Sequence, residues 1–172
     1  MKALLVIDML NDFIKPEGAL YIGPAGEKIV PAIKERLDLY RQNKEPVIFI
    51  CDRHRQGDLE FEMFPPHCLE GDEGGKVVAE LAPLPGERII YKRRYSAFYG
   101  TELDLTLREY GVTEIELTGV VTNICVLYTA ADARMRNYRV SVFPGAVAGI
   151  DEEAHRFALQ EMEKTLGVTL LK

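Results

Sequence analysis

The sequence has no apolar run longer than a β-strand, no tryptophan, and only three cysteines among its 172 residues. A helix that spans a bilayer needs about 20 mostly apolar residues in a row, so we expect no part of the chain to enter a membrane. An odd number of cysteines argues against a disulfide framework. Cys51, Cys68 and Cys125 are therefore expected to be buried thiols, metal ligands or reactive thiols.

The chain is also poor in positive charge, with 21 basic against 27 acidic residues and a net charge of −6. This balance argues against a nucleic acid or an anionic membrane surface as a partner. The segment from Met1 to Ile7 is similar to the start of a secretion signal, but Asp8 interrupts it and no small-residue cleavage site follows. We therefore expect a cytoplasmic protein with a single domain over residues 1–172.

What the chain does contain is an alternation of strand-like and helix-like segments. Strands are expected at residues 3–7, 47–51, 88–91, 114–118, 138–143 and 167–171, and helices at 27–42, 102–110, 122–137 and 151–166. This order predicts a Rossmann-like, three-layer α/β/α fold around a six-stranded, mostly parallel sheet. Ligands of such sheets bind outside the carboxyl ends of the strands.

Chemically active residues follow four of these strands. Asp8 follows the first, the pair Asp52 and His54 the second, Lys92 the third, and Cys125 lies shortly after the fourth. Each alone has an ordinary explanation, because a strand-end aspartate often caps a turn and a lysine is usually solvated. Their joint placement at one edge of the sheet predicts a catalytic site.

Cys125 has the features of an activated nucleophile. Thr122 is a candidate N-cap, which would place Cys125 in a first helical turn, where the helix dipole stabilises a thiolate and free N–H groups bind an oxyanion. We expect Lys92 to lower the pKa of the thiol further and Asp8 to accept and return a proton. The alternative is that Cys125 simply packs under the helix.

A metal site is the second prediction from this edge of the sheet. Asp52 and His54 share a face if the strand conformation continues, and His67 adds a third donor. A carboxylate with imidazoles suits zinc, iron or manganese. The alternative is that His54 and His67 are unrelated loop residues.

Three segments resemble the motifs of the isochorismatase-like cysteine hydrolases, and within them of the nicotinamidases. They are Leu5–Phe13 (LVIDMLNDF), Tyr91–Phe98 (YKRRYSAF) and Gly119–Val126 (GVVTNICV). The resemblance runs nearly end to end and implies the isochorismatase-like hydrolase fold. Members of this family are often homo-oligomers, so the resemblance also implies that this protein forms a homo-oligomer.

The resemblance implies a reaction as well. Asp8, Lys92 and Cys125 would be catalytic, and the N–H groups of Val121 and Cys125 would bind the oxyanion, with the Val120–Val121 peptide in the cis form. The expected substrate is a small amide, nicotinamide, which would be hydrolysed to nicotinate and ammonia through a thioester.

A divalent metal, zinc with iron or manganese as alternatives, is implied by the same relatives. Its expected ligands are Asp52, His54, His67 and, from the intervening loop, Glu60. Asp58 and Glu62 are weaker candidates for that last position. Phe13, Phe64 and Leu20 are expected to line the substrate pocket.

Some positions depart from the family pattern. Arg53 stands where a tryptophan is usual, Phe64 is often tryptophan in relatives, and the loop from His54 to His67 is short. We expect His155 to be structural, and Arg93 and Arg94 to be solvated or at a subunit contact. The departures leave open another amide, carbamoyl or ureido substrate. Cleavage of isochorismate and a non-catalytic thiol-containing binding protein are further alternatives.

Overall fold

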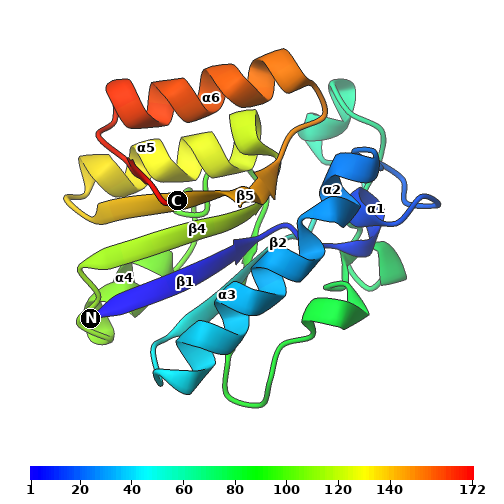
Figure 1. Ribbon diagram of the computed structural model, residues 1–172. Helices are drawn as coiled ribbons and strands as arrows, with labels where there is room; N and C mark the ends of the chain where they lie inside the picture. The colour runs from blue at the N-terminus through cyan, green and yellow to red at the C-terminus, as the bar shows by residue number, and fades with distance from the viewer.

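A computed structural model describes all 172 residues and contains one sheet of six parallel strands (Figure 1). The strands are β1 (Lys2–Ile7), β2 (Val47–Asp52), β3 (Arg88–Lys92), β4 (Glu114–Val120), β5 (Arg139–Ala148) and β6 (Thr169–Leu170). Their order across the sheet is β3-β2-β1-β4-β5-β6. The predicted six-stranded α/β fold is confirmed.

Helices cover both faces of the sheet. They are α1 (Asn11–Ile14), α2 (Pro24–Lys28), α3 (Val30–Gln42), α4 (Leu103–Glu109), α5 (Leu127–Met135) and α6 (Glu152–Lys164). Figure 1 shows α2 and α3 on one side of the sheet and α5 and α6 on the other. Short 3-10 turns at Leu59–Glu62, Glu73–Gly75 and Ala79–Leu81 lie in the long connection from β2 to β3. No helix has both the length and the apolar character needed to cross a membrane.

The continuous apolar run of β1 is explained by burial on both faces. Leu4 and Val6 belong to the core under α3, whereas Ala3, Leu5 and Ile7 belong to the core under α4, α5 and α6. Alternate residues of a strand point to opposite faces, so a strand covered on both sides must be apolar throughout. This double burial holds the carboxyl end of β1 rigidly at the centre of the sheet.

The helix expected over residues 122–137 is interrupted. Residues Thr122–Val126 form a π-helical segment and α5 begins only at Leu127. The predicted N-cap role of Thr122 is wrong: its hydroxyl lies 2.8 Å from Nδ1 of His155 instead of binding the first turn. His155 thus ties α6 to the segment that carries the predicted nucleophile.

Candidate active site

The predicted site residues come together at the carboxyl ends of four strands. Asp8 directly follows β1, Asp52 ends β2, Lys92 ends β3, and Cys125 lies in the π-helical segment after β4. These strands are neighbours in the order β3-β2-β1-β4, so residues far apart in sequence meet at one edge. All four side chains are buried.

Asp8, Lys92 and Cys125 form one contact network. Nζ of Lys92 lies 3.4 Å from Sγ of Cys125 and 2.9 Å from Oδ2 of Asp8. The other carboxylate oxygen of Asp8 accepts a hydrogen bond of 2.9 Å from the backbone N–H of Asp52. Asp8 itself has a positive φ of 52°, an uncommon conformation that turns its side chain out of the strand. The network fixes both oxygens of Asp8 beside the thiol.

Burial sets the protonation of this network. It raises the pKa of Asp8 to about 6, with a further rise from Asp52 that Lys92 opposes. Burial also raises the pKa of the Cys125 thiol well above its usual value, despite the opposing charge of Lys92. Lys92 does lower the thiol pKa, as predicted, but desolvation outweighs it and the net shift is upward. At neutral pH the pair is a protonated thiol beside an ionised carboxylate.

The turn after β4 presents backbone N–H groups to the same place. Gly119 has a φ of +108°, and a Cβ there would lie 2.0 Å from the carbonyl oxygen of Ile7, so only glycine fits. The Val120–Val121 peptide is cis, as expected. The N–H of Val121 donates no backbone hydrogen bond, and both Val121 and Cys125 line the active-site cavity.

The predicted metal ligands form a second, adjacent cluster. One donor atom each from Asp52, His54, Glu60 and His67 lies within 4.8 Å of all the others. Nε2 of His54 is 3.6 Å from Oδ2 of Asp52, and Nε2 of His67 is 3.8 Å from the same oxygen. Nε2 of His54 and Oε2 of Glu60 are buried without a hydrogen-bond partner. Such orphaned polar atoms are costly unless something binds them.

Neighbouring groups aim both imidazoles at the centre of this cluster. Nδ1 of His54 lies 3.1 Å from Oδ2 of Asp58, and Nδ1 of His67 lies 2.8 Å from the carbonyl oxygen of Pro65. In each ring the second nitrogen is thereby left free to face the cluster. Asp58 therefore contacts the outer nitrogen of His54 and is not itself at the centre of the cluster. Glu62 is exposed, so Glu60 is the acidic loop residue at the cluster.

The charges of the cluster suit a divalent cation. Burial favours a high pKa for Asp52, but contact with Lys92 and the two imidazoles holds it well below the usual range. Burial and the charge of Asp52 raise the pKa of Glu60. Two close carboxylates with two imidazoles match the donor set of zinc, iron and manganese sites. The residues present therefore fit the implied metal.

Arg93 and Arg94 are partly solvated, as expected, and each also pairs with a buried carboxylate. Nε of Arg93 donates to Oδ2 of Asp58, and Nη1 of Arg94 donates to Oδ1, each at 3.0 Å. Asp58 is fully buried and needs this compensation. The two arginines thus support the carboxylate that orients His54.

One narrow cavity joins both groups of residues. It is lined by the predicted pocket residues Phe13, Leu20 and Phe64 together with Asp8, Asp52, Glu60, His67, Val121 and Cys125. Most of the lining residues are hydrophobic, as in sites for small organic ligands.

Sequence reasoning did not assign five residues that also line this cavity. They are Ile22, Tyr95, Val120, Ile124 and Ile150. Ile150 follows β5, so the rule that ligands bind beyond strand ends would have found it. It is 59% exposed, which makes it the most open part of the lining. Tyr95 lies three residues after Lys92, but only the folded loop brings it to the cavity.

A family model described as the isochorismatase domain matches residues 2–171. The chain belongs to the isochorismatase family. An uncharacterized isochorismatase family protein from Bacillus subtilis is 39% identical over 176 residues, which cover 96% of each protein. The family assignment made from the three motifs is confirmed, and the chain is an isochorismatase-family hydrolase.

Several solved structures have the same fold as this chain, and they belong to amidases with different substrates. A pyrazinamidase/nicotinamidase from Streptococcus mutans is 37% identical with a TM-score of 0.95, over 99% of this chain and 100% of that one. A pyrazinamidase from Pyrococcus horikoshii in complex with zinc is 34% identical, with a TM-score of 0.92 over 99% and 98%. An N-carbamoylsarcosine amidase from Thermoplasma acidophilum is 36% identical, with a TM-score of 0.91 over 99% and 95%.

Proposed function

We propose that this isochorismatase-family hydrolase is a metal-assisted cysteine amidohydrolase that converts nicotinamide and water to nicotinate and ammonia. The observation that carries the proposal is that Asp8 and Cys125, both in contact with Lys92, line the same cavity as Asp52, Glu60 and His67. The first group supplies acyl transfer. The cluster of predicted metal ligands would favour an amide that carries a ring nitrogen over an amide without one.

Acylation begins with transfer of the thiol proton of Cys125 to the carboxylate of Asp8. The sulfur attacks the amide carbonyl carbon, a C–S bond forms, and the oxyanion accepts hydrogen bonds from the N–H groups of Val121 and Cys125. Protonated Asp8 then gives its proton to the amide nitrogen as the C–N bond breaks. Ammonia leaves, and the acyl group remains on Cys125 as a thioester.

Deacylation reverses these roles with water. Asp8 takes a proton from water, whose oxygen attacks the thioester carbonyl carbon, and the same two N–H groups hold the second oxyanion. The C–S bond breaks, and the sulfur recovers its proton from Asp8 as the carboxylic acid product departs. Throughout, the ammonium of Lys92 stays within reach of both Asp8 and Cys125 and stabilises the negative charge that moves between them.

A divalent ion held by Asp52, His54, Glu60 and His67 would supply a Lewis acid able to hold the pyridine nitrogen of the substrate. The chain itself contributes the apolar walls. The rings of Phe13 and Phe64 pack against the imidazole of His67 at a steep angle, with ring centroids 5.4 and 6.4 Å from that of His67. They would pack against the pyridine ring of the substrate.

A carbamoyl or ureido substrate is the second candidate. It is favoured by the similarity to the N-carbamoylsarcosine amidase, at 36% identity. The two candidates share the steps at Cys125 and differ in what occupies the cluster. An aliphatic carbamoyl compound has no ring nitrogen to place there.

Ammonia release from nicotinamide, pyrazinamide, N-carbamoylsarcosine and ureido compounds by the purified, metal-loaded protein tests the proposal. We expect kcat/KM to be highest for nicotinamide and to vanish in Cys125→Ala. A preference for carbamoyl compounds would replace nicotinamide by the second candidate. No release from any amide, with the metal bound, would refute the amidohydrolase.

A further inference from the structure

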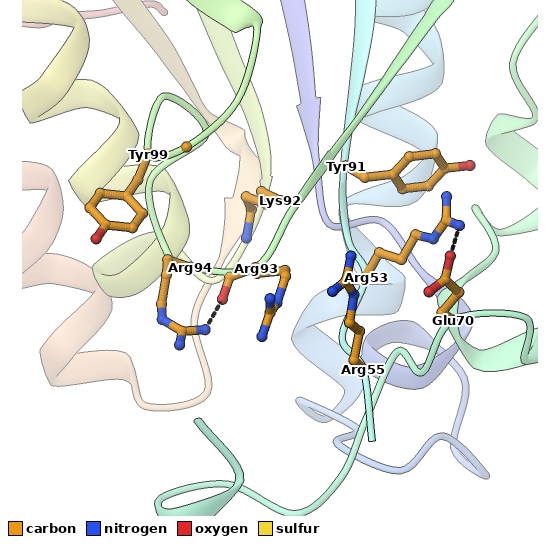
Figure 2. Close-up of a pocket in the computed structure, with 9 residues that line it drawn as sticks. Arg53, Arg55, Glu70, Tyr91, Lys92, Arg93, Arg94 and Tyr99 are labelled. Atoms are coloured by element: carbon orange, nitrogen blue, oxygen red, sulfur yellow. Dashed lines mark hydrogen bonds and ion pairs between the residues drawn. The ribbon is translucent and has the colours of Figure 1, made fainter. Parts of the chain in front are cut away.

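Four arginine side chains gather around a second cavity of about 500 Å³, which Lys92 of the active site also lines (Figure 2). Arg53 and Arg55 come from the segment after β2, and Arg93 and Arg94 from the segment after β3. In Figure 2 the two pairs lie on opposite sides of the cavity. Nothing in the proposed amide hydrolysis uses the outer side of these residues.

The second cavity lies on the reverse side of the active-site wall. The side chains of Asp52 and His54 belong to the cluster of predicted metal ligands. Those of Arg53 and Arg55, at the alternate positions, line the second cavity. This is the alternation expected of an extended segment. Arg53 therefore lines this cavity and not the substrate pocket.

Arg93 and Arg94 are anchored before any ligand arrives. Buried Asp58 accepts a hydrogen bond from each guanidinium, and their side chains remain 47% and 39% exposed. A guanidinium has five N–H donors, so each arginine keeps donors beyond those that Asp58 uses. Fixing the side chains in advance lowers the entropy that a ligand must overcome.

The opposite wall adds uncompensated charge. Arg53 pairs with Glu70 and lies 4.4 Å above the ring of Tyr91, whereas Arg55 has no ion pair in the structure. Three of the four guanidinium groups pair with carboxylates, those of Asp58, Glu60 and Glu70, and only Glu70 lines the cavity with them. This local excess of positive charge stands out in a chain whose net charge is −6.

We propose that the second cavity binds a small molecule with a diphosphate group, either free or as part of a nucleoside diphosphate. Guanidinium groups match phosphate oxygens with paired hydrogen bonds, and two facing pairs suit two linked phosphates. The volume is in the range of small-ligand sites. The ring of Tyr99, 67% exposed on the same lining, offers a surface on which a base would stack. This site does not depend on the amidase proposal.

Calorimetric titration of the purified full chain with pyrophosphate and with ADP tests the site. We expect saturable binding that weakens as salt rises, since the attraction is between exposed charges. Arg55→Gln should weaken it about tenfold or more, the usual effect of losing a charged hydrogen bond. The matched control is Arg88→Gln, which removes an exposed arginine of β3 outside the cavity and should leave binding unchanged.

The two probes separate the two sources of the diphosphate. Tighter binding of ADP that falls to the level of pyrophosphate in Tyr99→Ala identifies a nucleotide, and equal binding identifies free diphosphate. Both probes can also extract a metal from the active site, but that heat would persist in Arg55→Gln. No binding, or an isotherm that is identical in Arg55→Gln, would overturn the proposal.

Discussion

The ammonium of Lys92 is hydrogen-bonded to Asp52 and also lies 2.9 Å from Asp8. One positive charge therefore serves both the carboxylate beside the thiol and the first carboxylate of the metal-type cluster. All three side chains are buried, so solvent screens the charge of Lys92 only weakly. The proposed chemistry and the proposed metal site are thus coupled electrostatically.

Removal of this charge should damage stability as well as activity. In Lys92→Met two buried carboxylates lose their only ammonium, and a broken buried ion pair typically costs about 3–5 kcal/mol. We expect a clearly lower midpoint of urea unfolding and no measurable amide hydrolysis. Lys2→Met removes a lysine whose side chain is 56% exposed and should leave the midpoint almost unchanged. Equal midpoints for the two variants would contradict the arrangement.

Asp8 should impose an acid limb on the reaction. Its pKa is raised to about 6, by burial first and by Asp52 second. The base must be ionised, so kcat/KM should be half its maximum near pH 6, rise to a plateau at higher pH and fall as the pH drops further. Asp8→Asn should reduce kcat/KM by about 10²–10⁴ and remove this limb. An unchanged pH profile in that variant would assign the proton transfer to another group.

The metal-type cluster predicts a measurable metal content. The purified protein should hold about one equivalent of zinc, iron or manganese by elemental analysis, and His54→Ala should lose it. Asp58→Asn should weaken metal retention against a chelator by about 10–100-fold, the usual effect of changing a group that orients a ligand. Glu62→Gln, an exposed acid of the same loop, is the control and should retain the metal. Full retention in His54→Ala would refute the site.

The close approach of Gly119 to β1 can be tested against another glycine. Gly119 and Gly86 both have positive φ, but only Gly119 meets backbone atoms where a Cβ would be, at 2.0 Å from the carbonyl oxygen of Ile7. Gly86→Ala should cost about 1–2 kcal/mol for its backbone conformation alone. Gly119→Ala should lose at least about 1–3 kcal/mol more and also lose activity, because it displaces the turn that carries Val121. Thermal unfolding and ammonia release measure both effects.

Local patterns in the sequence determined the fold class and much of the site. Apolar runs bounded by turns predicted six strands. Because ligands of parallel sheets bind beyond the carboxyl ends of the strands, the sequence alone also selected Asp8, Asp52, Lys92 and Cys125. These signals depend on neighbours within a few residues and on the geometry common to all parallel sheets. For that reason they survive without knowledge of the tertiary contacts.

Partner choice and desolvation were decided only by the tertiary structure. Burial raises the pKa of Cys125, where the sequence predicted a lowered one, because the thiol is enclosed by segments distant along the chain. Asp58 pairs with Arg93 and Arg94, 35 and 36 residues away, which leaves Glu60 at the cluster. The same pairing fixes the arginines of the second cavity. A charge or a pKa depends on everything within a few ångströms, and only the folded chain determines which residues those are.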